Sequence, residues 1–504
     1  MKHPDLQKPP LQRVQALIFL GAIALAFTAR FASVDVRQVW LDEALTQYAV
    51  SLDWSGLIAD RISAGHSPFY FLAMKALGLD GSDLRALRIV SAAMDSLAAG
   101  ILAAGVTRCA GARAGLFAAL FYALNPLLLL WGQTARPYGM LMMWLAIGSA
   151  GAAGLIGGAS QNAFARRGSI ALSLGLGGAA ATLTGGVIAA GVIALSPLAA
   201  PSLRTNPQFR KAWGRALILP GCVALAMATL ISLPHAGAVQ DVYWTTRYAP
   251  LTVQSASTVL METVAGDQIA WLQPQLPLGA AGMTALSVLL LVLFSVCIFR
   301  ALQVRAAMPG LLPYVALGAG YPAVLLILSV FTSLLVGRYF LPAVAAVMML
   351  AAVGAARLSR QRPGALLLPV LIAALCTTSL NQSLSPGWPQ SRVAQALSGL
   401  ILSLSQPGAQ VLLDPEDDLG AAVRTRLLFD RLAAPVFPDI LETKGGRAAL
   451  AAIGKGPVFL VLPSDQWLRH GAAVLPAPTC LWKSGSAVLA YWAERPAACP
   501  QSSG

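Results

Sequence analysis

Long apolar stretches recur along the chain as far as residue 381. A helix needs about 20 apolar residues to cross the hydrocarbon core of a bilayer, where its backbone groups can pair only within the segment. About eleven segments meet this requirement. They are residues 14–33, 86–106, 114–131, 138–157, 169–183, 186–200, 216–234, 276–298, 312–333, 338–357 and 365–381. Because 57% of the residues are hydrophobic and 11% are charged, we predict a mainly α, polytopic membrane protein rather than an ordinary soluble domain.

The basic residues predict which side of the membrane each connection faces. With the amino end in the cytoplasm, most Lys and Arg residues between spans fall in inner connections, and the later short outer loops carry chiefly Arg136, Arg247 and Arg338. The stretch 169–200 is short for two spans, and one tilted span there would reverse everything after it. The net charge of +14 is interpreted as a topology signal and a contact for anionic lipids. Nucleic acid is not an expected partner, because the basic residues are spread over separate loops.

The membrane domain is predicted to cover residues 1–381. Its first outer loop, at about 35–85, is rich in aromatic residues, which suits helices that lie in the membrane interface. One such amphipathic helix is predicted at 53–62. The helix-breaking residues Gly65-His66-Ser67-Pro68 follow it, and a second apolar run starts at Phe69.

Residues 382–504 are predicted to form a small extracytoplasmic α/β domain, because acids, prolines and turns return there. Short buried strands are predicted at 410–414 and 457–463, and a helix at 418–432. An oxidising compartment would allow a disulfide between Cys480 and Cys499, which both fall in this domain.

Ionisable residues in and near the first two spans are candidates for function. Asp42 and Glu43 follow the first span. Asp42 either caps a helix that begins at Glu43, or acts as a general base near the bilayer surface. Asp95 falls inside the second span on roughly the same helical face as Arg88, and we expect it to bond an Arg or a neighbouring helix. Arg88, near the outer end of that span, could equally contact a phosphate.

Later outer connections carry further polar candidates. Arg136 precedes Pro137, which begins a helix, and a helix start favours anions; the alternative is an arginine that reaches to the lipid headgroups. Arg338 begins another span at the depth of a lipid phosphate. The loop at 235–275 either lines a sugar pocket or rests in the interface. Its polar and aromatic residues include Tyr243, Trp244, Arg247 and Glu262.

These stretches together resemble the GT-C membrane glycosyltransferases, specifically the family 39 relatives of protein O-mannosyltransferases and lipid A aminoarabinose transferases. The resemblance covers roughly residues 10–360. Asp42-Glu43 resembles the first-loop acidic pair of the family, and His66-Ser67-Pro68-Phe69-Tyr70 is similar to a His-Pro-Pro-Leu-Tyr-Tyr stretch near the donor phosphate.

Two more elements follow in the expected order. Gln133-Thr134-Ala135-Arg136-Pro137-Tyr138 resembles a Ser-Gln-Glu-Ala-Arg-Pro-Tyr element, and Arg338-Tyr339-Phe340-Leu341-Pro342 resembles an Arg-Tyr-Leu-Leu-Pro element. Thr134 departs from the acid that many relatives carry. This departure leaves a second carboxylate, and any metal site built on it, without support.

The resemblance implies an inverting transfer of a sugar from a polyprenyl-phosphate donor to an envelope glycan, lipid or protein on the periplasmic face of a bacterial inner membrane. Asp42 would be the general base, with Glu43 beside it. The expected phosphate contacts are Arg136, Arg338, His66 and Arg88. The expected pocket residues are Tyr48, Gln133, Tyr138, Tyr243, Trp244, Arg247 and Tyr339. No cofactor is expected, and a divalent metal is left open. The alternatives are a transporter or flippase of lipid-linked sugars, and a scaffold without catalytic activity.

Overall fold

The computed structural model describes residues 11–37, 41–157, 162–232, 251–266, 278–304, 307–331, 334–385, 389–404 and 410–413, together with 423, 457–463, 475, 477–484 and 487–492. The chain divides into two compact units. The first comprises Met1–Val36, Asp53–Leu79 and Arg85–Ser385, and the second comprises Arg37–Leu52, Asp80–Leu84 and Pro386–Gly504. Parts of the first outer loop therefore group with the C-terminal residues, which the sequence did not predict.

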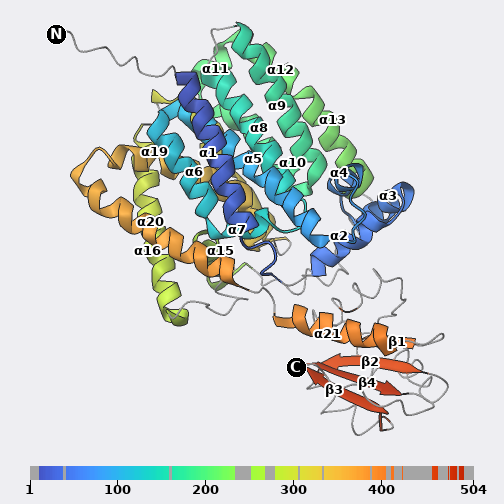
Figure 1. The fold of residues 1–504 in the computed structure, drawn as a ribbon. Coiled ribbons are helices and arrows are strands. Elements are labelled where there is room, and N and C mark those ends of the chain that lie inside the picture. The colour runs from blue at the N-terminus through green and yellow to red at the C-terminus, as the bar shows by residue number, and fades with distance from the viewer. Residues whose placement is uncertain are drawn as a thin grey trace. The chain divides into compact units, whose positions relative to one another are not determined.

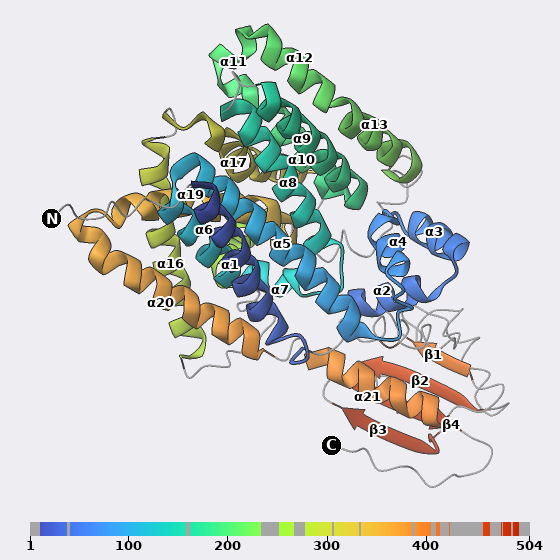
Figure 2. The ribbon, with the colours of Figure 1, turned by 45° about the horizontal axis from the view of Figure 1, so that its top comes forward.

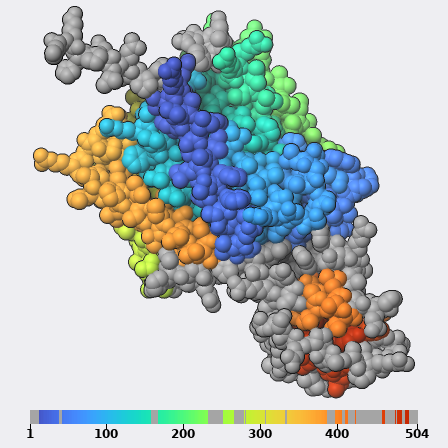
Figure 3. Space-filling view, viewed as in Figure 1, coloured from blue at the N-terminus to red at the C-terminus, as the bar shows by residue number. Residues whose placement is uncertain are grey.

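The first unit consists of packed helices (Figure 1). Those helices are α1 (Leu11–Phe31), α3 (Trp54–Ser63), α4 (Phe69–Ala76), α5 (Leu84–Ala110), α6 (Ala112–Leu124), α7 (Pro126–Gly132), α8 (Tyr138–Gly157), α9 (Asn162–Thr182), α10 (Thr184–Leu195), α11 (Pro201–Thr205), α12 (Pro207–Ala216), α13 (Ile218–Met227), α15 (Val253–Ala265), α16 (Gly279–Leu302), α17 (Leu312–Val315), α18 (Tyr321–Leu328), α19 (Leu341–Leu358) and α20 (Arg362–Leu384), with the short segments η1 (Ser196–Ala199), η2 (Ala228–Ser232), η5 (Pro309–Leu311), η6 (Ala316–Gly320) and η7 (Gly337–Phe340). Figure 2 shows α8, α9 and α13 side by side, and Figure 3 shows α1 along the outside of the unit.

Eight helical segments of the described chain are long and apolar enough to cross a membrane. They are Gln12–Phe31, Leu84–Ala110, Tyr138–Gly157, Pro207–Ile231, Ala281–Leu302, Pro309–Leu328, Gly337–Leu358 and Arg362–Leu384. The prediction of a polytopic helical protein is confirmed. Each predicted span overlaps one or more helices, and the predicted pair at 169–200 corresponds to α9 and α10, which are not among these eight segments.

The span predicted at 114–131 is broken. Helices α6 and α7 meet at an angle of 64°, and counting this pair as one span raises the number of spans to nine. Pro126 lacks the amide that a continuous helix needs, and it forces Asn125 into an extended conformation with φ −66° and ψ 123°. The Asn125 side chain then caps α7 by accepting from the Leu128 amide at 3.0 Å.

The helix predicted at 53–62 is confirmed as α3, and α4 begins at Phe69 as expected. Asp53 is the N-cap of α3, because its carboxylate accepts from the Gly56 amide at 2.7 Å and from the Ser55 hydroxyl at 2.9 Å. These hydrogen bonds to the charged form lower the pKa of Asp53 below its usual value, with the Gly56 amide as the largest cause.

The second unit contains α2 (Leu41–Ser51), α21 (Pro389–Leu404) and the strands β1 (Gln410–Leu413), β2 (Val458–Pro463), β3 (Cys480–Ser484) and β4 (Ala487–Trp492). The sheet order is β1-β2-β4-β3, with β1 and β2 parallel and the other pairs antiparallel. The strands predicted at 410–414 and 457–463 are confirmed. Of the helix predicted at 418–432, only Val423 lies within the described residues.

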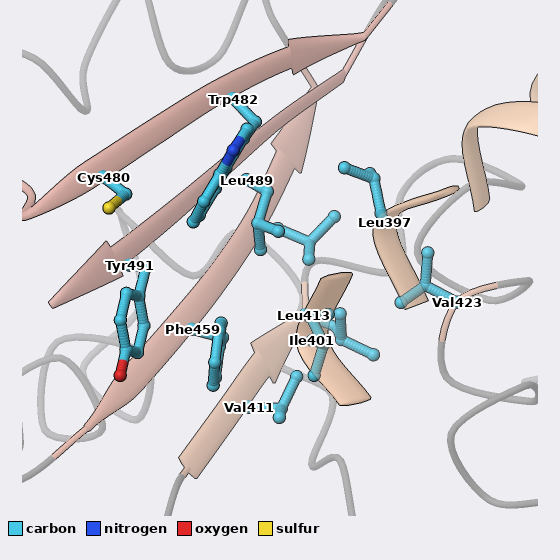
Figure 4. Packing of buried hydrophobic residues seen from close by; sticks show 11 residues of the cluster. Leu397, Ile401, Val411, Leu413, Val423, Phe459, Cys480, Trp482, Leu489 and Tyr491 are labelled. Carbon is cyan, nitrogen blue, oxygen red and sulfur yellow. The ribbon is translucent and has the colours of Figure 1, made fainter. Parts of the chain in front are cut away.

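A small apolar core holds this α/β unit together (Figure 4). Leu397 and Ile401 of α21 belong to the same buried cluster as side chains of the sheet. Phe459 and Tyr491 pair across neighbouring strands and stack with their ring centroids 4.4 Å apart. Cys480 is buried here and disulfide-bonded, whereas Cys499, its predicted partner, lies outside the described residues.

Candidate functional site

An arginine lies against aromatic rings where η7, the end of α7 and the start of α8 come together in the first unit. The guanidinium carbon of Arg338, in η7, lies 5.5 Å from the ring centroid of Trp131 and 5.5 Å from that of Tyr339. Trp131 in turn packs edge to face on Tyr138 at 5.1 Å. Arg338 is only 8% exposed. Ring faces attract a cation that has left bulk water, so this cluster keeps a buried positive charge in place.

The connection between α7 and α8 carries Arg136 beside this cluster, two residues before Tyr138. A tight turn runs from Thr134 to the Arg136 amide, which donates to the Thr134 carbonyl at 2.7 Å. The Thr134 hydroxyl donates to the Leu130 carbonyl at 2.8 Å. Gln133, also buried, accepts from the Ser33 hydroxyl at 2.8 Å. Gln133 and Thr134 therefore hold the connection in shape.

A buried ion pair lies against the start of this connection. Arg30 of α1 and Asp95 of α5 approach to 2.5 Å, and the Tyr122 hydroxyl donates to Asp95 at 2.8 Å. A Cβ on Gly132 would lie 2.5 Å from Asp95 Oδ2 and 2.7 Å from Arg30 Nε. Asp95 is thus bonded to an Arg and a neighbouring helix, as predicted, and the arginine is Arg30.

Glu262, which we expected either to line a sugar pocket or to rest in the interface, is a buried carboxylate of the first unit. It is 6% exposed, near the end of α15, and it is the only charged residue of that helix. A Cβ on Gly337 would lie 2.5 Å from its Oε2 atom, so the carboxylate rests against the backbone beside Arg338. We expected this stretch to belong to the loop at 235–275, and the available signal was an acid with no other charge between residues 253 and 265.

The acidic pair lies in the first turn of α2, in the second unit. Asp42 and Glu43 are 5% and 2% exposed. A carboxylate in the first turn of a helix interacts favourably with its dipole. Because α2 begins at Leu41, Asp42 lies inside the helix rather than before it, unlike the capping interpretation.

Gln47 fixes α2 to the segment 80–84 of the same unit. Its side-chain amide donates to the Gly81 carbonyl at 2.9 Å. Gly81 has φ +87°, and a Cβ there would collide with the Gln47 backbone, so only glycine suits this contact. Tyr48, another predicted pocket residue, is half-buried on the same helix.

Arg88 and His66, two further predicted phosphate contacts, lie within the described residues. Arg88 is buried and donates to the Val34 carbonyl at 2.8 Å. His66 is exposed, and the Ser67 hydroxyl beside it donates to the Ala181 carbonyl. Tyr243, Trp244 and Arg247 lie outside the described residues.

The described residues do not fit a metal site. Across this part of the chain, no three His, Cys, Asp or Glu side chains gather closely enough to hold an ion. The Thr134 hydroxyl donates to a backbone carbonyl. We therefore derive no step through a metal.

The fold and this cluster define a multi-pass helical membrane protein with a buried arginine among aromatic rings. No protein-family model matches the chain. No curated protein matches it in sequence. Solved structures match in fold: ArnT from Cupriavidus metallidurans bound to undecaprenyl phosphate is 15% identical, with a TM-score of 0.62 over 96% of this chain and 99% of that one.

An archaeal structure shows the same likeness. The Archaeoglobus fulgidus oligosaccharyltransferase in its apo form is 12% identical, with a TM-score of 0.54 over 90% of this chain and 70% of that one. AglB from the same organism, in complex with an inhibitory peptide and a dolichol-phosphate, is also 12% identical, with a TM-score of 0.50 over 90% of this chain and 69% of that one. The chain therefore shares its fold with these solved structures.

Proposed function

We propose that this protein is an inverting glycosyltransferase that moves a sugar from a polyprenyl-phosphate donor to a hydroxyl of an envelope glycan, lipid or protein. The observation that carries the proposal is the buried Arg338, whose guanidinium lies over the rings of Trp131 and Tyr339, beside the connection that bears Arg136. Membrane lipids surround the spans, and the reaction would take place at the periplasmic face of a bacterial inner membrane, with the amino end in the cytoplasm.

The chemistry assigns one role to the acid and another to the arginines. The acceptor oxygen attacks the anomeric carbon, a new carbon–oxygen bond forms, and the bond to the phosphate oxygen breaks in line. The electron pair of that bond leaves with the phosphate, as polyprenyl monophosphate. Asp42 takes the proton of the attacking hydroxyl, because a hydroxyl is a poor nucleophile until a base removes its proton. Glu43 adds to the negative charge beside it.

The leaving phosphate gains charge as its bond breaks, so fixed cations near it stabilise the transition state more than the ground state. Arg338 suits this role, because its aromatic neighbours already hold it in place. Arg136 lies on the tight turn beside the same cluster. His66 and Arg88 keep the role of secondary phosphate contacts in this proposal.

The structural neighbours support a lipid phosphate as the leaving group. ArnT was solved with undecaprenyl phosphate and AglB with a dolichol-phosphate, both of which are polyprenyl phosphates. The likeness extends over almost the whole of this chain, including its C-terminal part.

The proposal is tested by the transfer of label from a panel of radiolabelled polyprenyl-phosphate sugars to envelope fractions. Membranes that contain the wild type are compared with membranes that contain Asp42→Asn, and Asp35→Asn serves as a control at an exposed ion pair. Transfer by the wild type and the control, but not by Asp42→Asn, is the expected result. Equal transfer by Asp42→Asn removes Asp42 as the base. No transfer from any donor favours a transporter or a scaffold.

A further inference from the structure

We propose that Glu262 repels the polyprenyl monophosphate product from the arginine cluster and so speeds its release. The inference rests on the proposed function, because it concerns the leaving group of that reaction. It assigns a role to a buried carboxylate of the first unit that the catalytic scheme leaves unused.

The helix that carries the carboxylate is anchored beside the cluster. The Asn125 side chain donates to the Thr263 carbonyl at 2.9 Å, which ties the end of α15 to the start of α7. The Gly266 amide closes the helix by donating to the Glu262 carbonyl at 2.8 Å. Because the carboxylate occupies the space where Gly337 would carry a side chain, it lies against the residue that precedes Arg338.

Because these groups are buried, their charges interact strongly with each other and with a bound anion. Glu262 is 6% exposed and Arg338 is 8% exposed. Charges that are shielded from water interact far more strongly than charges in bulk solvent. A carboxylate fixed beside Arg338 therefore lowers the attraction of the cluster for any anion that binds there.

The donor and the product differ in charge, so Glu262 affects them unequally. The donor is a phosphodiester with one negative charge. The product is a phosphomonoester whose second proton has a pKa of about 6, so it carries nearly two charges at neutral pH. Arginines alone would hold the product more tightly than the donor. A fixed negative charge repels the dianion about twice as strongly as the monoanion. It therefore weakens the binding of the product more than the binding of the donor, and favours release.

The sign of the effect separates this role from a merely structural one. Loss of a structural group loosens the site and weakens the binding of every ligand. Loss of a repelling charge tightens the binding of the product. We therefore expect Glu262→Gln to lower the inhibition constant of undecaprenyl monophosphate by on the order of tenfold, with a smaller decrease in the KM of the donor and a lower kcat where release limits turnover.

The test measures product inhibition of the full-length protein in lipid nanodiscs, with undecaprenyl monophosphate as the probe. Glu262→Asp keeps the charge and should keep the inhibition constant of the wild type. Asp35→Asn removes an exposed carboxylate and should also leave it unchanged. If Glu262→Gln does not fold, Glu262→Ala replaces it, because alanine removes the charge without burying a polar group.

An unchanged or higher inhibition constant in the charge-removing variant overturns the inference while transfer by the wild type stands. A wild type that neither transfers sugar nor is inhibited by the monophosphate overturns the proposed function, and this inference with it. The two failures are thus distinguishable.

Discussion

Arg30 of α1 and Asp95 of α5 form an ion pair of 2.5 Å whose side chains are 0% and 1% exposed. The pair joins two helices that are far apart in the sequence, and Gly132 at the end of α7 closes over it. Arg30 also donates to the Ala26 carbonyl at 3.1 Å and to the Leu128 carbonyl at 3.4 Å. The connection that carries Arg136 therefore begins at a residue that packs against this buried ion pair.

Asp95→Asn should destabilise the membrane unit strongly. The substitution leaves the Arg30 charge buried without its counter-charge, a loss of about 3–5 kcal/mol for pairs of this kind. Thermal unfolding of the purified protein in detergent measures the effect. The matched control is Asp35→Asn, at a pair with Arg85 whose side chains are 61% and 55% exposed, where about 1 kcal/mol or less is expected. Equal melting temperatures for the two variants would contradict the assignment.

Gly132→Ala should also lower the melting temperature, for a steric reason. A Cβ at Gly132 would approach Asp95 Oδ2 to 2.5 Å and Arg30 Nε to 2.7 Å, so the ion pair or α7 must shift. Gly21→Ala in α1 is the control, because nothing lies within 4 Å of its Cβ position and alanine favours a helix by about 0.5–1 kcal/mol. The prediction is wrong if both substitutions stabilise the protein.

Much of this arrangement could be predicted from sequence, because the apolar spans and the turn residues act locally. The helix α3 and the strand at Val458–Pro463 follow from short patterns. The break at Pro126 was hidden inside a long apolar run, although the proline was visible. Arg30 could not be chosen over Arg88 as the partner of Asp95, because that choice depends on which helices pack together. The closeness of Glu262 to Gly337 depends on tertiary packing in the same way.

The helix cap at Asp53 predicts a local response to acid. Its pKa is lowered in the folded protein, so its stabilisation is fully present above the unfolded value of about 3.9 and is lost as the pH falls through the lower folded value. As the pH falls below the folded pKa of Asp53, hydrogen exchange of the α3 amides should therefore accelerate more in the wild type than in Asp53→Asn. Asparagine still caps a helix but does not titrate. Parallel responses of the two proteins would show that the Asp53 carboxylate does not control α3.

Arg338→Lys tests whether the clasped guanidinium, rather than its charge alone, stabilises the leaving phosphate. Lysine keeps the positive charge but loses the planar group that lies over Trp131 and Tyr339. If the geometry matters, the single-turnover transfer rate should fall toward the roughly 10²–10³-fold loss expected when a transition-state donor is removed, and Arg338→Ala should show the full loss. Arg85→Lys is the matched control, because Arg85 lies over the Phe31 ring at 5.7 Å with its side chain 55% exposed. The measurement is the single-turnover transfer rate at saturating donor, which excludes product release.

A wild-type rate in Arg338→Lys would mean that the cluster supplies only a diffuse positive potential, and Arg136 would then be the better candidate for the directed contact.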